Sequence, residues 1–283
     1  MTTIIKAPSK INLAIDILNK RDDGYHDIDI VTLPLDLHDC IELEVFPPKY
    51  GTFLTCDDNS IICDESNLVY KAYRLMKQKY NFDSGMRIKI YKNIPVEAGL
   101  GGGSADAAAL INGLNKIFKL KMSDQDKIDI AIQIGSDVPY CIFNKPARMR
   151  YKGDKLDFID VKKKWAVLLI QPDQGLSTGG VYKVSDTVKG EKPNIEELIK
   201  GLESGDDNLI QENMKNGLQN AAISVLPEIE ELINRLKEEG LTKVMMSGSG
   251  STVFALDENV KKLKKIAKKF EDEHHSVWIS KTL

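Results

Sequence analysis

The stretch of sequence with the clearest chemical potential runs from Pro95 to Ala108. It places four glycines within positions 99 to 103, and Ser104 follows them directly. Glycines let a backbone approach a ligand closely, and the first turn of a helix presents unpaired N–H groups that favour an anion. The Ser104 hydroxyl could hydrogen-bond a phosphate or approach a bound metal. The run therefore predicts a phosphate-binding loop, with a tight strand-to-helix turn as the structural alternative.

This loop matches neither of the common nucleotide-binding patterns. No lysine follows its glycines, and their spacing does not fit G-x-G-x-x-G. A second glycine- and serine-rich turn occupies residues 246–252. Such runs are often flexible linkers. Here it is short and flanked by apolar segments, which favours a shaped turn.

Three smaller clusters are ambiguous when taken singly. Lys10 and Asn12 project to the same side of a predicted strand, because side chains alternate along it. Asp137 follows the end of a predicted helix, and Tyr25-His26 follows an Asp-Asp-Gly turn. The alternative interpretations are a surface lysine for Lys10, a turn-forming residue for Asp137 and an ordinary pair of loop residues for Tyr25-His26. The four histidines form no metal-ligand pattern.

Alternating and helical hydrophobic patterns predict the elements that must position these residues. Ser123 and Asp126 are typical of a capping box, and a glycine ends the helix predicted after Pro227. The expected strands are 10–16, 26–45, 86–91, 165–170, 243–246, 252–256 and 277–280, and the expected helices are 67–80, 107–118, 123–135, 227–240 and 258–270. The pattern predicts an α+β protein with domains at residues 1–158 and 159–283.

Composition limits the possible partners. The 283 residues carry 39 Lys and Arg against 42 Asp and Glu, a formal charge of -3, which offers no basic footprint for nucleic acid. No apolar run is long enough to span a membrane. The four cysteines form no CxxC pair, and no secretion signal precedes them. We therefore expect a cytoplasmic protein with reduced thiols and no structural zinc.

Taken together, these segments resemble the GHMP kinase superfamily, which is named for galactokinase and for homoserine, mevalonate and phosphomevalonate kinases. Its three motifs recur in order, as Lys10–Leu13, Pro95–Ala108 and Met246–Phe254. The segments Arg21–His26 and Ile134–Pro139 add to the similarity, which covers nearly the whole chain. The resemblance implies a two-domain α+β fold with the active site in the cleft between the domains.

The resemblance also implies roles for individual residues. Asp137 matches the catalytic base, and Lys10 matches the lysine that stabilises the developing oxyanion. The implied cofactors are ATP and Mg²⁺, with Ser104 as a possible metal ligand. The residues implied in ATP binding are Pro95, Gly99, Gly101, Gly102, Gly103, Ser104, Ala105 and Asn67.

The implied acceptor is a small cytidyl molecule. Similarity to one branch of the superfamily implies phosphorylation of the 2-hydroxyl of a diphosphocytidyl-linked methylerythritol, in the non-mevalonate isoprenoid pathway. His26 matches a residue that hydrogen-bonds the base edge, while Tyr25 and Tyr182 match the aromatic residues on either side of the base. Asn12 matches a substrate-contacting position. The oligomeric state stays open.

The chain departs from the family pattern at several positions. Tyr151 stands where relatives carry glycine, and Thr32 stands where some carry an aromatic residue. Two alternatives remain. One is another GHMP kinase acting on homoserine or a mevalonate derivative, and the other is a catalytically silent nucleotide sensor on the same scaffold. Tyr25, His26 and Tyr182 argue against the first, and Lys10 with Asp137 argues against the second.

Overall fold

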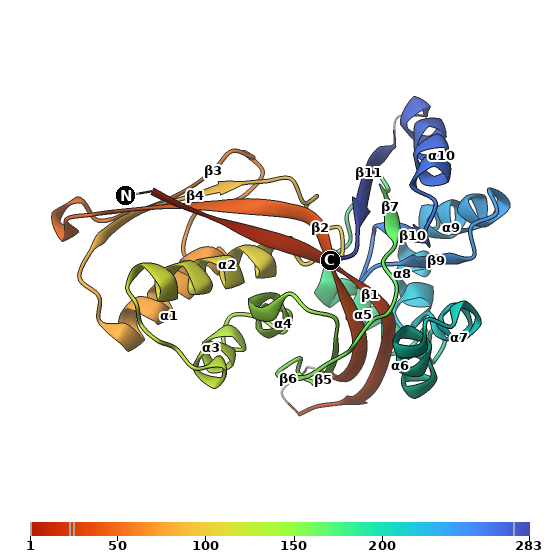
Figure 1. Cartoon of the computed structure of the whole chain (residues 1–283), viewed down its shortest axis with the longest axis horizontal. Helices are drawn as coiled ribbons and strands as arrows, with labels where there is room; N and C mark the ends of the chain where they lie inside the picture. The colour runs from red at the N-terminus through yellow and green to blue at the C-terminus, as the bar shows by residue number, and fades with distance from the viewer. Residues whose placement is uncertain (1, 23, 25, 274) are drawn as a thin grey trace. The chain divides into compact units, whose positions relative to one another are not determined.

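A computed structural model describes residues 2–22, 24, 26–273 and 275–283. They form two compact units, each assembled from separate stretches of chain (Figure 1). Unit 1 contains the residues up to Ser9, Leu37–Pro95 and Gly101–Asn144, and unit 2 contains Lys10–Asp36, Val96–Leu100 and Lys145–Leu283. The expected domains, 1–158 and 159–283, are consecutive stretches of sequence, whereas these units are defined by contacts. The expected boundary at residue 158 therefore stays a prediction.

Two long strands, β1 (Thr2–Lys20) and β2 (His26–Phe46), contribute residues to both units. In unit 1 the second half of β2 pairs antiparallel with β4, and β3 pairs parallel with β4. The remaining elements of unit 1 are η1 (Pro48–Tyr50), β3 (Thr52–Cys56), α1 (Leu68–Tyr80), β4 (Gly85–Tyr91), α2 (Gly102–Ile117), α3 (Asp124–Ala131) and α4 (Val138–Phe143).

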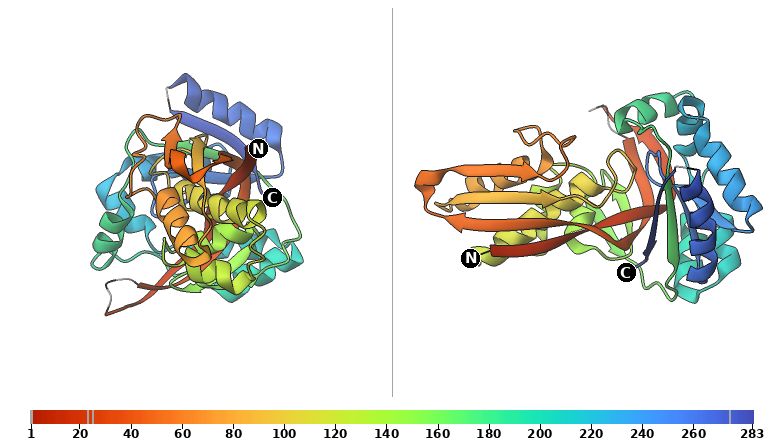
Figure 2. Two further views of the ribbon diagram at one scale, coloured as in Figure 1. Left: turned by 90° about the vertical axis from the view of Figure 1, so that its left-hand side faces the viewer. Right: turned by 90° about the horizontal axis from the view of Figure 1, so that it is seen from above.

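Helix α2 is the centre of the unit 1 core. It has a run of alanines and leucines that form helices readily, and most of them are buried. A Cβ atom on Gly113 would lie only 2.3 Å from Ile5 Cδ1 and 2.7 Å from Leu43 Cδ1, so the helix packs very closely on the sheet. Figures 1 and 2 show α1 and α2 side by side on one face of the β3-β4-β2 strands.

Unit 2 contains the first half of β2, which pairs antiparallel with β5, and the part of β1 that pairs parallel with β8. A separate four-stranded antiparallel sheet has the order β11-β7-β10-β9. The elements are β5 (Ala147–Tyr151), β6 (Lys155–Phe158), β7 (Ala166–Gln171), α5 (Thr178–Ser185), α6 (Ile195–Ser204), α7 (Asp207–Asn213), β8 (Lys215–Asn216), α8 (Gln219–Val225), α9 (Glu228–Glu238), β9 (Lys243–Met246), β10 (Val253–Asp257), α10 (Val260–Asp272) and β11 (Ser276–Lys281).

The four-stranded sheet forms the main core of unit 2. Strand β7 lies between β11 and β10, and its residues Val167–Ile170 are all fully buried, which explains their uninterrupted apolar run. Helix α10 packs on β7 through an apolar stripe that includes Leu263, Ile266 and Phe270. The right-hand view of Figure 2 shows the helix beside this sheet.

Most predicted elements are confirmed to within a few residues. Strands β1 and β2 extend beyond the predicted ranges, and α2 begins at Gly102, earlier than the apolar stripe alone indicated. Ser123 and Asp126 form the predicted capping box at α3, but the helix ends at Ala131 rather than near Gly135. The sequence did not indicate η1, β3, α4, β5, β6 or β8, nor the bounds of the helices from α5 to α8.

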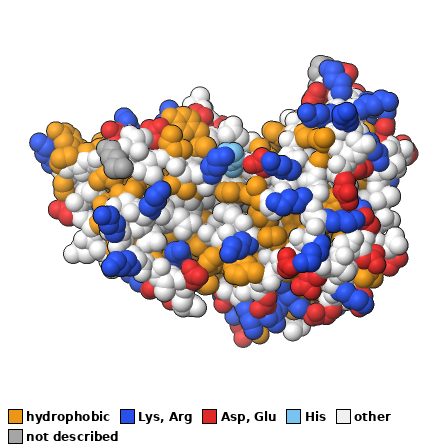
Figure 3. All heavy atoms as spheres, in the orientation of Figure 1, with side chains coloured by type: hydrophobic (Ala, Val, Ile, Leu, Met, Phe, Trp, Pro, Cys, Tyr) orange, Lys and Arg blue, Asp and Glu red, His pale blue; other side chains and the backbone are white. Residues whose placement is uncertain are grey.

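The surface agrees with the near-neutral charge balance. Over the face drawn in Figure 3, the Lys and Arg side chains alternate with Asp and Glu side chains. In the described part of the chain, no helix combines the length and the apolar character that crossing a bilayer requires.

Candidate active site

The glycine-rich loop of unit 1 leads directly into α2, as the sequence predicts. Gly101 adopts a left-handed conformation, φ 73°, at the N-cap, and no side chain caps the helix. The first turn of α2 contains no acidic residue. Its N–H groups and the positive end of the helix dipole are therefore suited to an anion.

Side chains on two sides limit the space around this loop. A Cβ atom on Gly102 would lie 3.1 Å from Lys92 Nζ and 3.2 Å from Ile94 Cγ2, and one on Gly103 would lie 3.7 Å from Leu68 Cδ1. Ser104 lies in the first turn of α2, and its hydroxyl has no hydrogen-bond partner among the described residues. That hydroxyl suits a phosphate oxygen or a metal bound to one.

Two other predicted residues of unit 1 occupy helix starts. The Asn67 side chain caps α1, since its Oδ1 accepts from Val69 N at 2.9 Å and its Nδ2 donates to the Ile62 carbonyl at 2.8 Å. Asp137 is the N-cap residue of α4 but makes no capping bond with its side chain, and it is half-buried. Its carboxylate therefore does not serve to cap that helix.

A buried hydrogen-bond chain surrounds Lys10 in unit 2. Lys10 Nζ donates to Asn12 Oδ1 at 2.8 Å and to the Gly99 carbonyl at 3.0 Å, and Lys10 is only 4% exposed. Asn12 in turn donates to Thr32 Oγ1 at 2.9 Å. The alternative that Lys10 is an idle surface lysine is therefore wrong. At position 32, where some relatives carry an aromatic residue, the Thr32 hydroxyl accepts this hydrogen bond.

The second glycine-rich turn packs against Gly99 in the same unit. Ser247 Oγ donates to the Gly99 carbonyl at 3.0 Å, and a Cβ atom on Gly248 would lie 3.2 Å from Lys10 Nζ. A Cβ atom on Gly99 would lie 2.1 Å from the Ser247 carbonyl oxygen, so no other residue fits there. The turn is therefore a shaped support for the Lys10 segment.

Asn216 holds this turn in place and was missed by the sequence analysis. Its side-chain amide donates to the carbonyls of Met246 and Gly248, at 3.0 and 2.8 Å, and its Oδ1 accepts from Leu218 N at 2.9 Å. It lies on β8, next to β1. No motif marks a single asparagine 30 residues before the turn, so only the fold reveals its role.

The predicted cytidyl-binding residues that are described also lie together in unit 2. His26 and Tyr182 stack with ring centroids 5.6 Å apart, and His26 Nε2 lies 2.9 Å from Asp186 Oδ1. Asp186 also pairs with Lys20, and these two partners lower the pKa of the Asp186 carboxyl, Lys20 most. The predicted residue Tyr25 lies outside the described residues.

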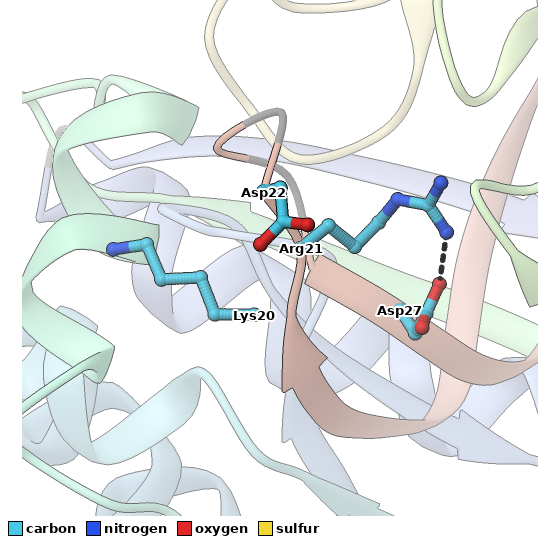
Figure 4. Close-up of a pocket in the computed structure, with 4 residues that line it drawn as sticks. All are labelled: Lys20, Arg21, Asp22 and Asp27. Atoms are coloured by element: carbon cyan, nitrogen blue, oxygen red, sulfur yellow. Dashed lines mark hydrogen bonds and ion pairs between the residues drawn. The ribbon is translucent and has the colours of Figure 1, made fainter.

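A pocket at the end of β1 is lined by Lys20, Arg21, Asp22 and Asp27 (Figure 4). The Arg21 guanidinium turns toward Asp27 and pairs with it at 2.7 Å, while Lys20 points away from both. Ligand pockets are predominantly apolar with a few convergent polar groups. This pocket is lined by charged residues throughout, and its residue Lys20 pairs with Asp186, the partner of His26.

In the ranges that the structure describes, no group of three or more His, Cys, Asp or Glu side chains could hold an ion. A magnesium ion usually takes one or two carboxylates and completes its shell with substrate phosphates and water.

Two family models match this chain. Residues 67–145 match the family model of the GHMP kinases N terminal domain, and residues 198–276 match that of the GHMP kinases C terminal. A 4-diphosphocytidyl-2-C-methyl-D-erythritol kinase of Clostridium beijerinckii is 38% identical, covering 99% of both chains.

Solved structures share the fold over the same length. A crystal structure of 4-(cytidine 5'-diphospho)-2C-methyl-D-erythritol kinase superposes with a TM-score of 0.81 at 27% identity, covering 99% of both chains. A homoserine kinase from Cytophaga hutchinsonii gives a TM-score of 0.75 at 17% identity, covering 100% of this chain and 94% of its own. The second similarity shows the fold alone.

Proposed function

The chain belongs to the GHMP kinase family, and from that premise we propose that it phosphorylates the 2-hydroxyl of 4-diphosphocytidyl-2-C-methyl-D-erythritol with ATP, in the non-mevalonate isoprenoid pathway. The observation that carries the proposal is the full-length match to relatives of that name, 38% identical over 99% of both chains. The buried Lys10 ammonium beside Gly99 supports it, because a lysine held in this way is suited to chemistry rather than to solvation.

The ATP phosphates bind at the loop from Gly101 to Ser104. The first turn of α2 has no side-chain cap and supplies N–H donors to the phosphates. The Ser104 hydroxyl is available to the phosphates or to Mg²⁺. When bound, Mg²⁺ neutralises charge on the transferred phosphoryl group. Pro95, Gly99, Ala105 and Asn67 complete the proposed ATP-binding set, Asn67 by holding the start of α1 in place.

Asp137 and Lys10 act on the attacking hydroxyl. Asp137 accepts its proton while the new O–P bond forms, the bond from the γ-phosphorus to the bridging oxygen breaks, and ADP leaves. Lys10 stabilises the charge that develops on the attacking oxygen, and Asn12 fixes its ammonium at 2.8 Å.

The cytidine base binds beside His26 and Tyr182, with Tyr25 as the second aromatic neighbour. Asp186 engages His26 Nε2, and the other ring nitrogen, Nδ1, has no partner within the described part of the chain. That nitrogen is available to the base edge. A homoserine or mevalonate acceptor has no base, so the aromatic set favours the cytidyl acceptor over that alternative.

The test measures ATP consumption with a panel of cytidyl and non-cytidyl alcohols. We expect turnover with the cytidyl substrate and none with homoserine or mevalonate. Asp137→Ala should abolish turnover and retain ATP binding, whereas Asp124→Ala, the same change at an exposed position of unit 1, should behave as the parent. Substantial turnover by Asp137→Ala would refute the role of Asp137, and turnover with none of the alcohols would favour a silent sensor.

A further inference from the structure

Two side chains from one short segment of unit 2 hold the backbone of the second glycine-rich turn. Asn216 Nδ2 donates to the carbonyls of Met246 and Gly248, at 3.0 and 2.8 Å. Gln219 Oε1 accepts from Met246 N at 3.1 Å. Three backbone groups at the start of the turn are therefore bonded to these two side chains, Asn216 and Gln219, which we call the clamp.

The clamp is itself anchored to strand β1. Asn216 is only 3% exposed, and its Oδ1 accepts from Leu218 N at 2.9 Å. It pairs with Ile15 of β1, and Gly217 N donates to the Ile15 carbonyl at 2.8 Å. An amide side chain whose oxygen and nitrogen are both bonded has a single orientation. The clamp therefore links the turn firmly to β1, the strand that also contains Lys10.

The turn held by the clamp contacts the carbonyl group that the Lys10 ammonium uses. Ser247 Oγ and Lys10 Nζ both donate to the Gly99 carbonyl oxygen, each at 3.0 Å. A Cβ atom on Gly248 would lie 2.7 Å from that oxygen and 3.2 Å from Lys10 Nζ. The turn therefore packs against both groups without free space. A displacement of the turn would move an acceptor of the ammonium.

The exact position of this ammonium matters for phosphoryl transfer. A lysine carries its charge at the end of a flexible four-carbon stem, so its hydrogen-bond acceptors determine where the charge lies. Asn12 Oδ1 and the Gly99 carbonyl are acceptors of Lys10 Nζ. A donor stabilises a developing oxyanion only within hydrogen-bond distance, and a misplacement of about 1 Å can lower the rate about a hundredfold.

We propose that Asn216 and Gln219 are positioning residues for phosphoryl transfer. They fix the backbone of the turn, the turn fixes the Gly99 carbonyl, and that carbonyl holds the Lys10 ammonium where the attacking oxygen needs it. The clamp thereby sets the rate of transfer and leaves the binding of ATP and of the acceptor unchanged. The inference rests on the catalytic role proposed for Lys10.

The experiment measures kcat and both KM values of the full-length protein with ATP and the cytidyl substrate. Asn216→Asp keeps the shape of the side chain but turns a carboxylate oxygen toward two carbonyls. We expect kcat to fall about 10- to 100-fold, while each KM stays within about threefold of the parent. Calorimetry should still find one ATP site per chain. The matched control is Asn208→Asp, at an exposed position of unit 2, which should behave as the parent.

A pair of variants at Gln219 tests the other half of the clamp. Gln219→Leu removes the acceptor of Met246 N, and kcat should fall about threefold to tenfold because one hydrogen bond is lost. Gln219→Glu retains an oxygen acceptor, so its kcat should stay close to that of the parent. Gln219 is half-buried at the start of α8, where an acidic side chain is favourable. This pair decides the question if Asn216→Asp fails to fold.

Several results would overturn the inference while the proposed function stands. They are a parent-like kcat in folded Asn216→Asp or in Gln219→Leu, a loss of ATP sites in proportion to kcat, and a kcat of Gln219→Glu as low as that of Gln219→Leu. A loss of sites would mean that the variant merely unfolds part of the protein. If the parent itself phosphorylated no cytidyl alcohol, the proposed function would fail and the inference with it.

Discussion

Two clusters in this protein combine lysine with aspartate and differ in burial. In unit 1, Lys92 lies between Asp39 and Asp106, all nearly inaccessible to water. In unit 2, Lys20 pairs with Asp186, which also contacts His26, and the Lys20 and Asp186 side chains are 56% and 30% exposed. The carboxyl pKa shifts are opposite: burial raises that of Asp106, whereas Lys20 and His26 lower that of Asp186.

The difference shows that the surroundings, rather than the residue types, decide what a lysine–aspartate pair does. Water screens the cluster of unit 2, so its charges contribute little to stability and remain available to a ligand. The cluster of unit 1 has no such screening, and each group depends on the others. Removal of a member of the unit 1 cluster should therefore affect folding, while removal of a member of the unit 2 cluster should affect recognition.

The largest expected effect is on folding, from Asp39→Ala. This change leaves the N–H groups of Asn93 and Ile94 without their acceptor and removes one of the two carboxyl partners of Lys92. We expect the free energy of unfolding to fall by about 3–5 kcal/mol, as measured by urea denaturation. The control is Asp124→Ala, at an exposed position. If Asp39→Ala lowered the free energy of unfolding no more than this control does, the difference between the two clusters would be contradicted.

In unit 2, the expected effect is on the cytidyl substrate. His26→Ala or Tyr25→Ala should weaken its binding, because stacking contributes about 1–3 kcal/mol per base. Affinity for ATP should hardly change, and both are measured by calorimetry. An equal loss of ATP affinity would mean that the base binds in a different pocket.

The pH dependence of stability should distinguish the clusters further. Folding raises the pKa of Asp106 from an unfolded value of about 3.9 to about 8, so the native state holds this proton more tightly. Its contribution is complete below pH 4 and is lost as the pH rises through about 8. Melting temperatures from pH 5 to 9 should therefore fall less steeply for Asp106→Asn than for the parent, and equal slopes would contradict this assignment.

The smallest expected effect is that of Lys20→Ala. It removes one exposed partner of Asp186 and leaves His26 in place as the other. We expect a melting temperature close to that of the parent, and a difference that shrinks further in 1 M salt, since salt screens surface pairs. A large loss of stability would show that exposure alone does not separate the two clusters.

Local patterns in the sequence predicted the parts of the site that depend on local structure. The glycine loop opening α2, the Ser123–Asp126 capping box and the two-residue spacing of Lys10 and Asn12 are all set by neighbours along the chain. The family resemblance added His26 and Tyr182, which lie together although 156 positions separate them.

The remaining features depend on contacts between distant residues. Asp39 reaches Lys92 across 53 positions, and Asn216 reaches the turn at Gly248 across 32. No periodicity marks either residue, because each is defined by the partner that the fold brings to it. The backbone conformation of Tyr151 is a further feature that the sequence does not predict. Its φ of 59° lies in a region that normally favours glycine, and nothing in its own residue type indicates this.

The sharing of β1 and β2 between the units has a practical consequence. A single cut after Asn144 would keep all of unit 1 on one fragment, together with Lys10–Asp36, so unit 2 would lose the parts of β1 and β2 that it contains. That cut would separate β5 and β8 from their partner strands β2 and β1. A version that ends at Asn144 for screening or crystallisation would therefore keep the strands of unit 1 but leave its segments of β1 and β2 without β8 and β5.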